Sequence, residues 1–164
     1  MRLTTALLGL ACLAAHPTAA RAQSGDALVT RGQYLVAIMD CTGCHTPGAL
    51  AGRPDPNRRL GGSDIGFGGP FGVVYPRNLT PDKDTGLGAW TDAEIGRAIR
   101  EGVARDGSVL VPVMPWPSYA VLTPDDLRAI IAFLRTLPPV RFASPANVKP
   151  GGRTTAPYLG VISP

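Results

Sequence analysis

The spacing of two cysteines and a histidine in Cys41-Thr42-Gly43-Cys44-His45 is the most informative chemical pattern in this 164-residue sequence. The pattern C-x-x-C-H is the attachment sequence of a c-type haem. Two thiols separated by one turn of chain can add to the two vinyl groups of one porphyrin, because those groups lie a fixed short distance apart. His45 follows directly, so its imidazole can reach the iron as an axial ligand. The sequence therefore predicts one covalent haem c, held by Cys41 and Cys44.

Other interpretations of the two cysteines are weaker. A thioredoxin-like C-x-x-C follows a β-strand, and no strand is predicted before Cys41. A structural zinc site takes four ligands, whereas the chain after Ala22 offers only Cys41, Cys44 and His45. A disulfide between the two cysteines stays open as the alternative if haem is never attached.

Residues 1–22 have the features of a secretory signal peptide. A positively charged start precedes the uncharged, mostly apolar stretch Leu3 to Ala15, and Ala20-Arg21-Ala22 predicts cleavage before Gln23. The apolar stretch is too short for a permanent membrane helix. Cys12 lies within it and would leave with it. Export agrees with haem attachment, and both predict a protein of the bacterial periplasm.

The remaining residues, 23–164, suit one domain. They hold 14 basic and 12 acidic residues, which gives a formal charge of +2 after cleavage. They contain no Lys/Arg cluster of the nucleic-acid-binding type, and no segment long and apolar enough to span a membrane. We therefore expect no nucleic acid partner and no stable membrane anchor. The predicted division is a haem domain over 23–141 and an extended C-terminal tail over 142–164.

A first helix is predicted over residues 24–40, directly before Cys41. Its apolar face follows helical spacing and comprises Leu28, Gly32, Leu35, Val36 and Met39. Glycine in a helix interior costs about 1 kcal/mol relative to alanine. We therefore interpret Gly32 as a point where another helix backbone approaches closely.

Two further helices are marked by capping residues. The second covers residues 91–102 and begins with a capping box formed by Thr91 and Glu94. The third follows Thr123 and ends before Pro138, because proline cannot continue a helix. Its buried stripe has the spacing i, i+3, i+4, i+7 and comprises Leu127, Ile130, Ile131 and Leu134.

Residues 46–90 are unusually rich in glycine and proline, which together account for more than a third of the stretch. So long an irregular stretch normally argues against a compact domain, but a flat apolar haem gives such loops a surface to pack on. The alternation of Phe67 with Phe71 to Tyr75, interrupted by Gly68-Gly69-Pro70, is a candidate for a short hairpin. The tail over 142–164 lacks periodicity and is either a docking arm or a loosely ordered end.

The second axial position of the iron has few candidates. After Ala22 there is no second histidine, and only Met39 and Met114 carry a thioether. Met39 lies on the apolar face of the first helix, too near Cys41 to reach the opposite side of the haem. Met114 lies far from Cys41 in the sequence, in a proline-rich loop that can hold a weak thioether ligand. Met114 is therefore the predicted second ligand.

Histidine and methionine ligation predicts electron transfer. A six-coordinate iron has no room for O₂ or peroxide, and the thioether favours Fe(II), which raises the reduction potential. An open iron would instead indicate a haem sensor or a haem enzyme. The ligand set thus favours the passage of single electrons over bond chemistry.

The order of helix, C-x-x-C-H, Gly-rich loop, methionine loop and final helix resembles class I c-type cytochromes. The resemblance is closer still to the haem modules in the cytochrome c subunits of periplasmic alcohol, gluconate and related dehydrogenases. It covers about residues 30–140. The stretches that carry it are Arg31-Gly32-Gln33-Tyr34-Leu35-Val36, Cys41 to His45, Phe71-Gly72-Val73-Val74-Tyr75, Asn78-Leu79-Thr80-Pro81-Asp82, Thr85-Gly86-Leu87-Gly88-Ala89-Trp90 and Met114-Pro115-Trp116-Pro117-Ser118-Tyr119.

The resemblance implies an all-α class I cytochrome c fold, with three main helices around one covalent haem and a first and a last helix that cross. It implies His45 and Met114 as axial ligands. It also implies that Tyr75, Asn78 and Trp90 lie near the haem or its propionates. The structural alternatives stay open here, because Tyr75 would also pack in a hairpin and Trp90 would also staple a helix.

The implied function is that of an electron-transfer protein rather than an enzyme. A periplasmic dehydrogenase would be the electron donor, with this chain as its subunit or dedicated acceptor, and an oxidase or another cytochrome would be the acceptor downstream. A freely diffusing shuttle to a terminal oxidase is the alternative. The sequence departs from the familiar subunits, which carry three haem modules and often have tyrosine at the position of Trp116.

Overall fold

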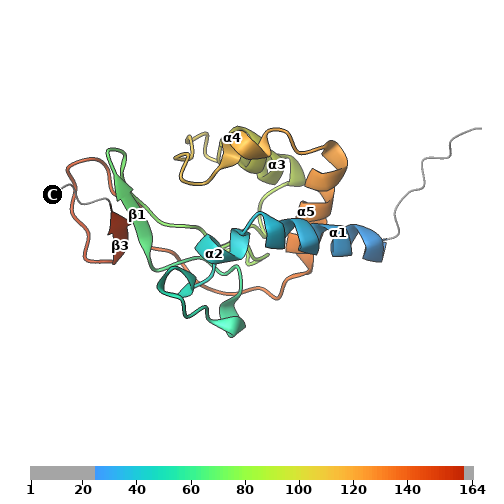
Figure 1. Ribbon diagram of the computed structural model, residues 1–164, viewed down its shortest axis with the longest axis horizontal. Coiled ribbons are helices and arrows are strands. Elements are labelled where there is room, and N and C mark those ends of the chain that lie inside the picture. The colour runs from blue at the N-terminus through green and yellow to red at the C-terminus, as the bar shows by residue number, and fades with distance from the viewer. Residues whose placement is uncertain (1–24, 161–164) are drawn as a thin grey trace, which may run out of the picture.

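The computed structural model describes residues 25–160, so the expected signal peptide lies outside the described residues. Within this range the helices gather at one end of the molecule and the strands at the other (Figure 1). The helices are α1 (Gly25–Ile38), α2 (Cys41–His45), α3 (Asp92–Glu101), α4 (Trp116–Tyr119) and α5 (Pro124–Thr136), with short 3-10 turns at Ala49–Ala51 and Pro56–Arg58. The strands are β1 (Gly66–Gly69), β2 (Gly72–Val74) and β3 (Tyr158–Gly160).

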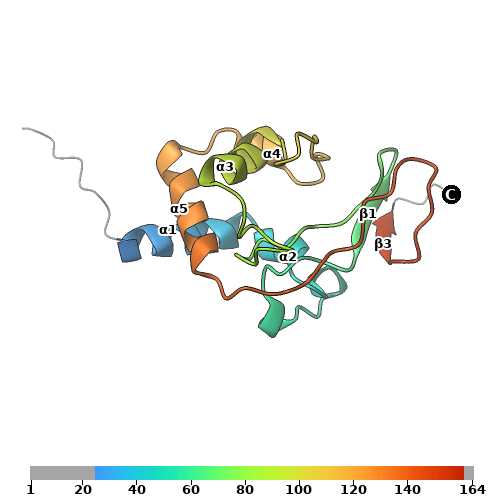
Figure 2. The same cartoon turned by 180° about the vertical axis from the view of Figure 1, so that it is seen from behind.

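Helices α1 and α5 cross, as both views show (Figures 1 and 2). A Cβ atom added to Gly32 would overlap the Ala129 carbonyl oxygen, far inside van der Waals contact. The predicted close approach at Gly32 is therefore confirmed. The crossing forms the centre of the core, whose buried members are Leu35, Val36, Leu60, Ala129, Ile130, Phe133 and Leu134.

Capping hydrogen bonds confirm the predicted starts of α3 and α5. The Thr91 hydroxyl accepts a hydrogen bond from the Glu94 N–H at 3.2 Å, and the Glu94 carboxylate accepts one from the Thr91 N–H at 2.8 Å. At α5, the Thr123 hydroxyl accepts from the Asp126 N–H at 3.1 Å. Arg31 donates to the Asp126 carboxylate at 2.9 Å, which ties the surface of α1 to the first turn of α5.

A three-stranded sheet forms beside the helices, in the order β2-β1-β3. Strands β1 and β2 are antiparallel, with Phe67 opposite Val74, so the predicted hairpin is confirmed. Strand β3 pairs in parallel with β1, with Phe67 opposite Leu159. The prediction of an all-α fold is thus incomplete. The third strand comes from the tail, whose sequence has no alternation of apolar and polar residues to signal it.

The C-terminal arm, defined as residues 138–160, runs back along the strands and the loop that follows them (Figure 2). Val148 forms an antiparallel bridge with Val73, and the Asn147 side chain accepts from the Tyr75 N–H at 3.0 Å. Gly72, at φ 92°, leaves no space for a side chain beside the Val148 carbonyl oxygen. The described part of the predicted tail is therefore an ordered arm, while the domain boundary at residue 141 stays a prediction.

No helix within residues 25–160 combines the length and the apolar character that crossing a bilayer requires.

The contact at Gly32 predicts a large effect of a single added methyl group. Gly32→Ala should lower the free energy of unfolding by about 1–3 kcal/mol or more, because overpacking must separate α1 from α5. Guanidinium unfolding of the protein measures this. Gly25→Ala is the control in the same helix, since nothing lies within 4 Å of a Cβ added there. Equal effects of the two substitutions would contradict the backbone contact.

Candidate haem site

The turn that carries the two cysteines is set up by Asp40. Asp40 adopts a left-handed conformation, φ 51°, directly after α1, and its carboxylate accepts from the Gly43 N–H at 3.2 Å. A Cβ atom added to Gly43 would collide with that carboxylate, so only glycine leaves room for the cap. The result is one helical turn, α2, in which Cys41 and Cys44 are three residues apart and share a face.

Both thiols are half-buried and free. Burial raises the pKa of Cys41 to about 11 and also raises the pKa of Cys44. Reactive C-x-x-C motifs of redox enzymes show the opposite shift, toward thiolate. The pair is therefore a set of protonated thiols at neutral pH, which does not match a thiol–disulfide catalyst.

The His45 imidazole is held by a main-chain acceptor. Its Nδ1 lies 2.7 Å from the Arg77 carbonyl oxygen. A carbonyl only accepts, so Nδ1 carries the proton and Nε2 has its lone pair available. Burial lowers the pKa of His45, which keeps the ring neutral. A neutral imidazole whose other nitrogen donates to a carbonyl is the usual state of a metal-ligating histidine.

Met114 lies on a loop between α3 and α4 that is fixed by its neighbours. The Trp116 indole packs directly on Gly102, where it occupies the space that a Cβ atom would need. The Trp116 Nε1–H donates to the Leu110 carbonyl at 3.0 Å, and the Trp116 N–H donates to the Met114 carbonyl at 2.7 Å. The half-buried Met114 therefore has a defined backbone position.

Tyr119 brings the Met114 loop to the cysteine turn. Its hydroxyl donates to the Met39 carbonyl at 3.1 Å, directly before the turn. Burial, with a further contribution from the nearby Cys41 and Cys44, raises the pKa of Tyr119 to about 12. Tyr119 belongs to the stretch Met114 to Tyr119 that carries the family resemblance, but the resemblance assigns no role to it. The contact depends on a backbone acceptor that is remote in the sequence, for which the sequence carries no signal.

Met39 itself packs against the α1–α5 core, as its place on the apolar face of the first helix predicts.

Tyr75 and Asn78 lie in the loop that supplies the His45 acceptor. Tyr75 is buried, and its hydroxyl donates to the Ala156 carbonyl of the C-terminal arm at 3.2 Å. Asn78 is buried too, and its amide donates to the Thr85 hydroxyl at 3.0 Å. Both residues therefore organise the loop and the arm through contacts of their own. Their predicted place beside the haem stays a prediction.

Trp90 lies half-buried directly before the capping box of α3. Its N–H donates to the Leu87 carbonyl at 3.0 Å, and its own carbonyl accepts from Arg135 of α5. These contacts join the Gly-rich loop to the last helix. A position of Trp90 near the haem propionates likewise stays a prediction.

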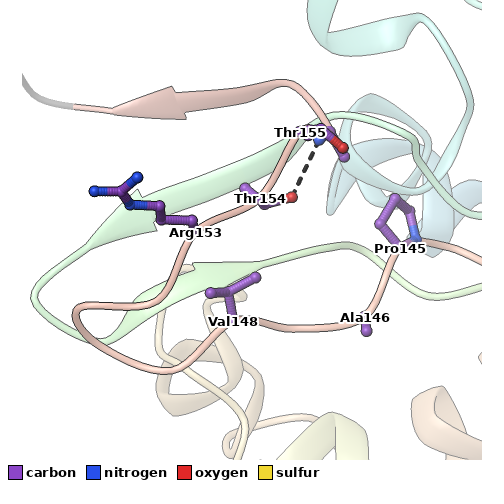
Figure 3. Close-up of a pocket in the computed structure, with 7 residues that line it drawn as sticks. Pro145, Ala146, Val148, Arg153, Thr154 and Thr155 are labelled. Carbon is purple, nitrogen blue, oxygen red and sulfur yellow. Dashed lines mark hydrogen bonds between the residues drawn. The ribbon is translucent and has the colours of Figure 1, made fainter.

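Among the described residues, two open pockets lie in the strand half of the molecule. One is lined by residues of the C-terminal arm, where the Ala156 N–H donates to the Thr154 hydroxyl at 3.1 Å (Figure 3). It contains none of the predicted haem ligands. The other is an apolar groove between the hairpin and the arm, and its lining includes Val113, next to Met114. The second cavity thus adjoins the predicted site.

The residues present fit a covalently attached haem. The fit rests on two protonated thiols on one helical turn, a neutral imidazole one residue later with Nε2 available, and a thioether loop linked to that turn through Tyr119. This donor chemistry defines the class of protein as a carrier of haem c. The chain belongs to the cytochrome c family, and the family description "Cytochrome c" matches residues 29–138.

Several relatives are cytochrome subunits of dehydrogenases. The gluconate 2-dehydrogenase cytochrome c subunit of Pantoea cypripedii is 41% identical over 123 residues, which cover 74% of this chain and 26% of that protein. The alcohol dehydrogenase (quinone) cytochrome c subunit of Gluconobacter oxydans (strain 621H) is 42% identical over 116 residues, 70% of this chain and 23% of that protein. The fructose dehydrogenase cytochrome subunit of Gluconobacter japonicus is 34% identical over 147 residues, 89% and 28% respectively.

The chain spans about a quarter of the length of these relatives. The resemblance seen in the sequence motifs is confirmed by the family match and by these relatives. Membership of the family implies covalent haem c and a role in electron transport.

The cysteine turn gives a direct test of haem attachment. Cys41→Ser or Cys44→Ser should lose most of the haem that survives denaturation, because a serine hydroxyl forms no thioether bond. Haem staining of a denaturing gel measures the loss in protein produced with haem-attachment machinery. Thr42→Ser, in the same turn, is the control and should keep full staining. Normal staining of both cysteine variants would contradict attachment at these residues.

Proposed function

We propose that this chain is a single-haem class I cytochrome c of the periplasm, which passes single electrons as the subunit or dedicated acceptor of a dehydrogenase. The observation that carries the proposal is the contact from Tyr119 to the Met39 carbonyl, because it joins the methionine loop to the cysteine turn. Bound haem supplies an iron that cycles between Fe(II) and Fe(III).

Four of the chain's own residues would hold that group. Cys41 and Cys44 would form the thioether bonds, while His45 and Met114 would be the axial ligands. The Arg77 carbonyl keeps the Nδ1 proton on His45, which leaves Nε2 unprotonated and free to bind a metal. The Met114 thioether would favour Fe(II) and raise the reduction potential. With both His45 and Met114 bound, the iron would have no open position, which supports a non-catalytic role.

The docking surface for the dehydrogenase would centre on the methionine loop. Val113 and Pro115 are exposed on either side of Met114, and Trp116 is half-exposed beside them. Redox encounters usually bury small interfaces, and an apolar centre close to the iron ligand suits such a contact. The names of the relatives support a dehydrogenase as electron donor. An oxidase or another cytochrome would accept the electron downstream.

Replacement of Met114 tests the ligand set. Met114→Ala should lower the midpoint potential and leave the reduced iron open to rapid, stoichiometric carbon monoxide binding, with haem still attached. Potentiometric titration and carbon monoxide difference spectra measure the two effects. Met39→Leu is the matched control, because Met39 packs against the core. Rapid and full carbon monoxide binding by the unchanged protein at neutral pH would overturn Met114 ligation and favour a sensor or an enzyme.

Purification under native conditions tests the partner. The tagged protein, extracted from its own periplasm in mild salt, should copurify with a dehydrogenase in a fixed ratio. Mass spectrometry identifies that partner, and its substrate names the donor reaction. A reducible and reoxidisable monomer without a partner would instead favour the freely diffusing shuttle.

A further inference from the structure

The loop that supplies the His45 acceptor is bonded to the C-terminal arm at three consecutive residues, 76–78. We propose that the arm positions the His45 imidazole and thereby tunes the iron ligand, with Arg77 and Ser144 as positioning residues. This inference rests on the proposed axial role of His45. It goes beyond that role, because it assigns a function in electron transfer to residues 140–145, which follow the last helix.

The first link is the bond between His45 and the loop. The Nδ1–H of His45 donates to the Arg77 carbonyl across 2.7 Å, which is a short bond for a nitrogen donor. Such a bond fixes both the rotation of the ring and its basicity toward a metal. Any displacement of the Arg77 carbonyl therefore changes the orientation and the donor strength of His45.

The second link is the side chain of the same residue. The Arg77 Nη1 donates to the Ser144 carbonyl at 3.3 Å and to the Pro145 carbonyl at 3.2 Å. Arg77 thus binds the ligand histidine through its main chain and the arm through its guanidinium. A shift of the arm therefore displaces the Arg77 carbonyl, because the side chain and the carbonyl belong to the same residue.

The third link is Ser144, which contacts both of the chain segments that are hydrogen-bonded to His45. Its hydroxyl donates to the Pro76 carbonyl at 2.7 Å, one residue before the acceptor. It also packs against Gly62, where an added Cβ would lie 2.6 Å from the Ser144 oxygen. The Gly62 N–H in turn donates to the main-chain carbonyl of His45 at 2.9 Å. Ser144 is therefore wedged between the two segments that bond to His45.

The fourth link is Asn78, the residue that follows Arg77 in the loop. The buried Asn78 amide donates to the Val140 carbonyl at 2.6 Å and to the Phe142 carbonyl at 3.5 Å. Residues 76, 77 and 78 consequently each bond to the arm within residues 140–145. No helix or strand includes this loop segment. The Ser63 N–H donates to the Pro76 carbonyl at 3.0 Å, and the arm supplies the side-chain contacts that hold the Arg77 residue itself.

The test uses the full chain with haem attached and reduced. Ser144→Ala removes one hydrogen bond to the loop without changing any charge, and Arg77→Gln removes the two bonds to the arm. Hydrogen exchange of the His45 Nδ1 proton, followed by NMR, should become roughly fivefold faster in Ser144→Ala, the factor expected for one lost hydrogen bond. It should become at least that much faster in Arg77→Gln, which loses two. The midpoint potential of Ser144→Ala should rise, because a weaker Nδ1 bond makes His45 a poorer donor to Fe(III).

Arg141→Gln is the matched control. Arg141 lies on the same arm and carries the same charge, but it pairs with Asp84 at 3.0 Å, and both side chains are exposed. This variant should leave the exchange rate unchanged. Arg77→Lys keeps the charge and one donor toward the arm, so it should restore part of the protection that Arg77→Gln loses. Arg77→Gln carries the test alone if Ser144→Ala does not fold.

Two outcomes separate this inference from the proposed function. In the first, Ser144→Ala and Arg77→Gln keep an iron-bound His45 and the wild-type exchange rate but have a lower thermal midpoint. That result would overturn the positioning role, because the arm would then contribute only to stability. Absence of an iron-bound His45 signal from the wild-type protein would overturn the proposed ligand set itself, and the inference with it.

Discussion

The backbone contact between α1 and α5 at Gly32 is the constraint on which the site depends. It fixes the axis of α1, and α1 ends shortly before the cysteine turn. The same crossing fixes α5, whose Arg135 donates to the Leu87 carbonyl at 2.9 Å and to Asp92 at the start of α3. One contact between two helices therefore orients the attachment turn and the Gly-rich loop together. A larger residue at position 32 would disturb both.

The two predicted iron ligands are held by the same kind of interaction from opposite parts of the chain. His45 donates to a loop carbonyl, and Tyr119, which follows Met114 closely, donates to the carbonyl of Met39. Both acceptors are main-chain carbonyls with a fixed position, because Met39 directly follows α1 and Arg77 is bonded to the arm. Rigid support of this kind suits a site that must change oxidation state without changing shape.

The parts of this structure that could be predicted from sequence are those with a local physical cause. Thr91 and Thr123 signal helix starts through their own side chains, and Gly32 signals a close contact by lacking one. The cysteine turn is equally local, since spacing alone defines it. Each of these signals can be recognised within about four positions of the sequence, even where the contact itself, as at Gly32, is with a distant helix.

The parts that could not be predicted depend on distant main-chain atoms. Arg77 acts on His45 through a carbonyl, which every residue possesses, so its identity gives no signal. The all-α prediction omitted β3 because the pairing partner of that strand is remote and its residues do not alternate. Tyr75 and Asn78 show a third limit of prediction from sequence. The family motif suggests that they contact a cofactor, whereas the structure shows their side chains bonded to the C-terminal arm.

The parallel pairing of β1 with β3 has a consequence for how the molecule assembles. Gly66 pairs with Tyr158 near the far end of the described chain, whereas β1 and β2 are joined by a tight turn. Contacts across so long a separation are slow to form, because the chain must first lose the entropy of closing the intervening loop. We therefore expect the hairpin and the cysteine turn to form while the arm is still free. The Arg77 carbonyl that accepts from His45 would then be fixed in position only when the arm docks and completes the sheet.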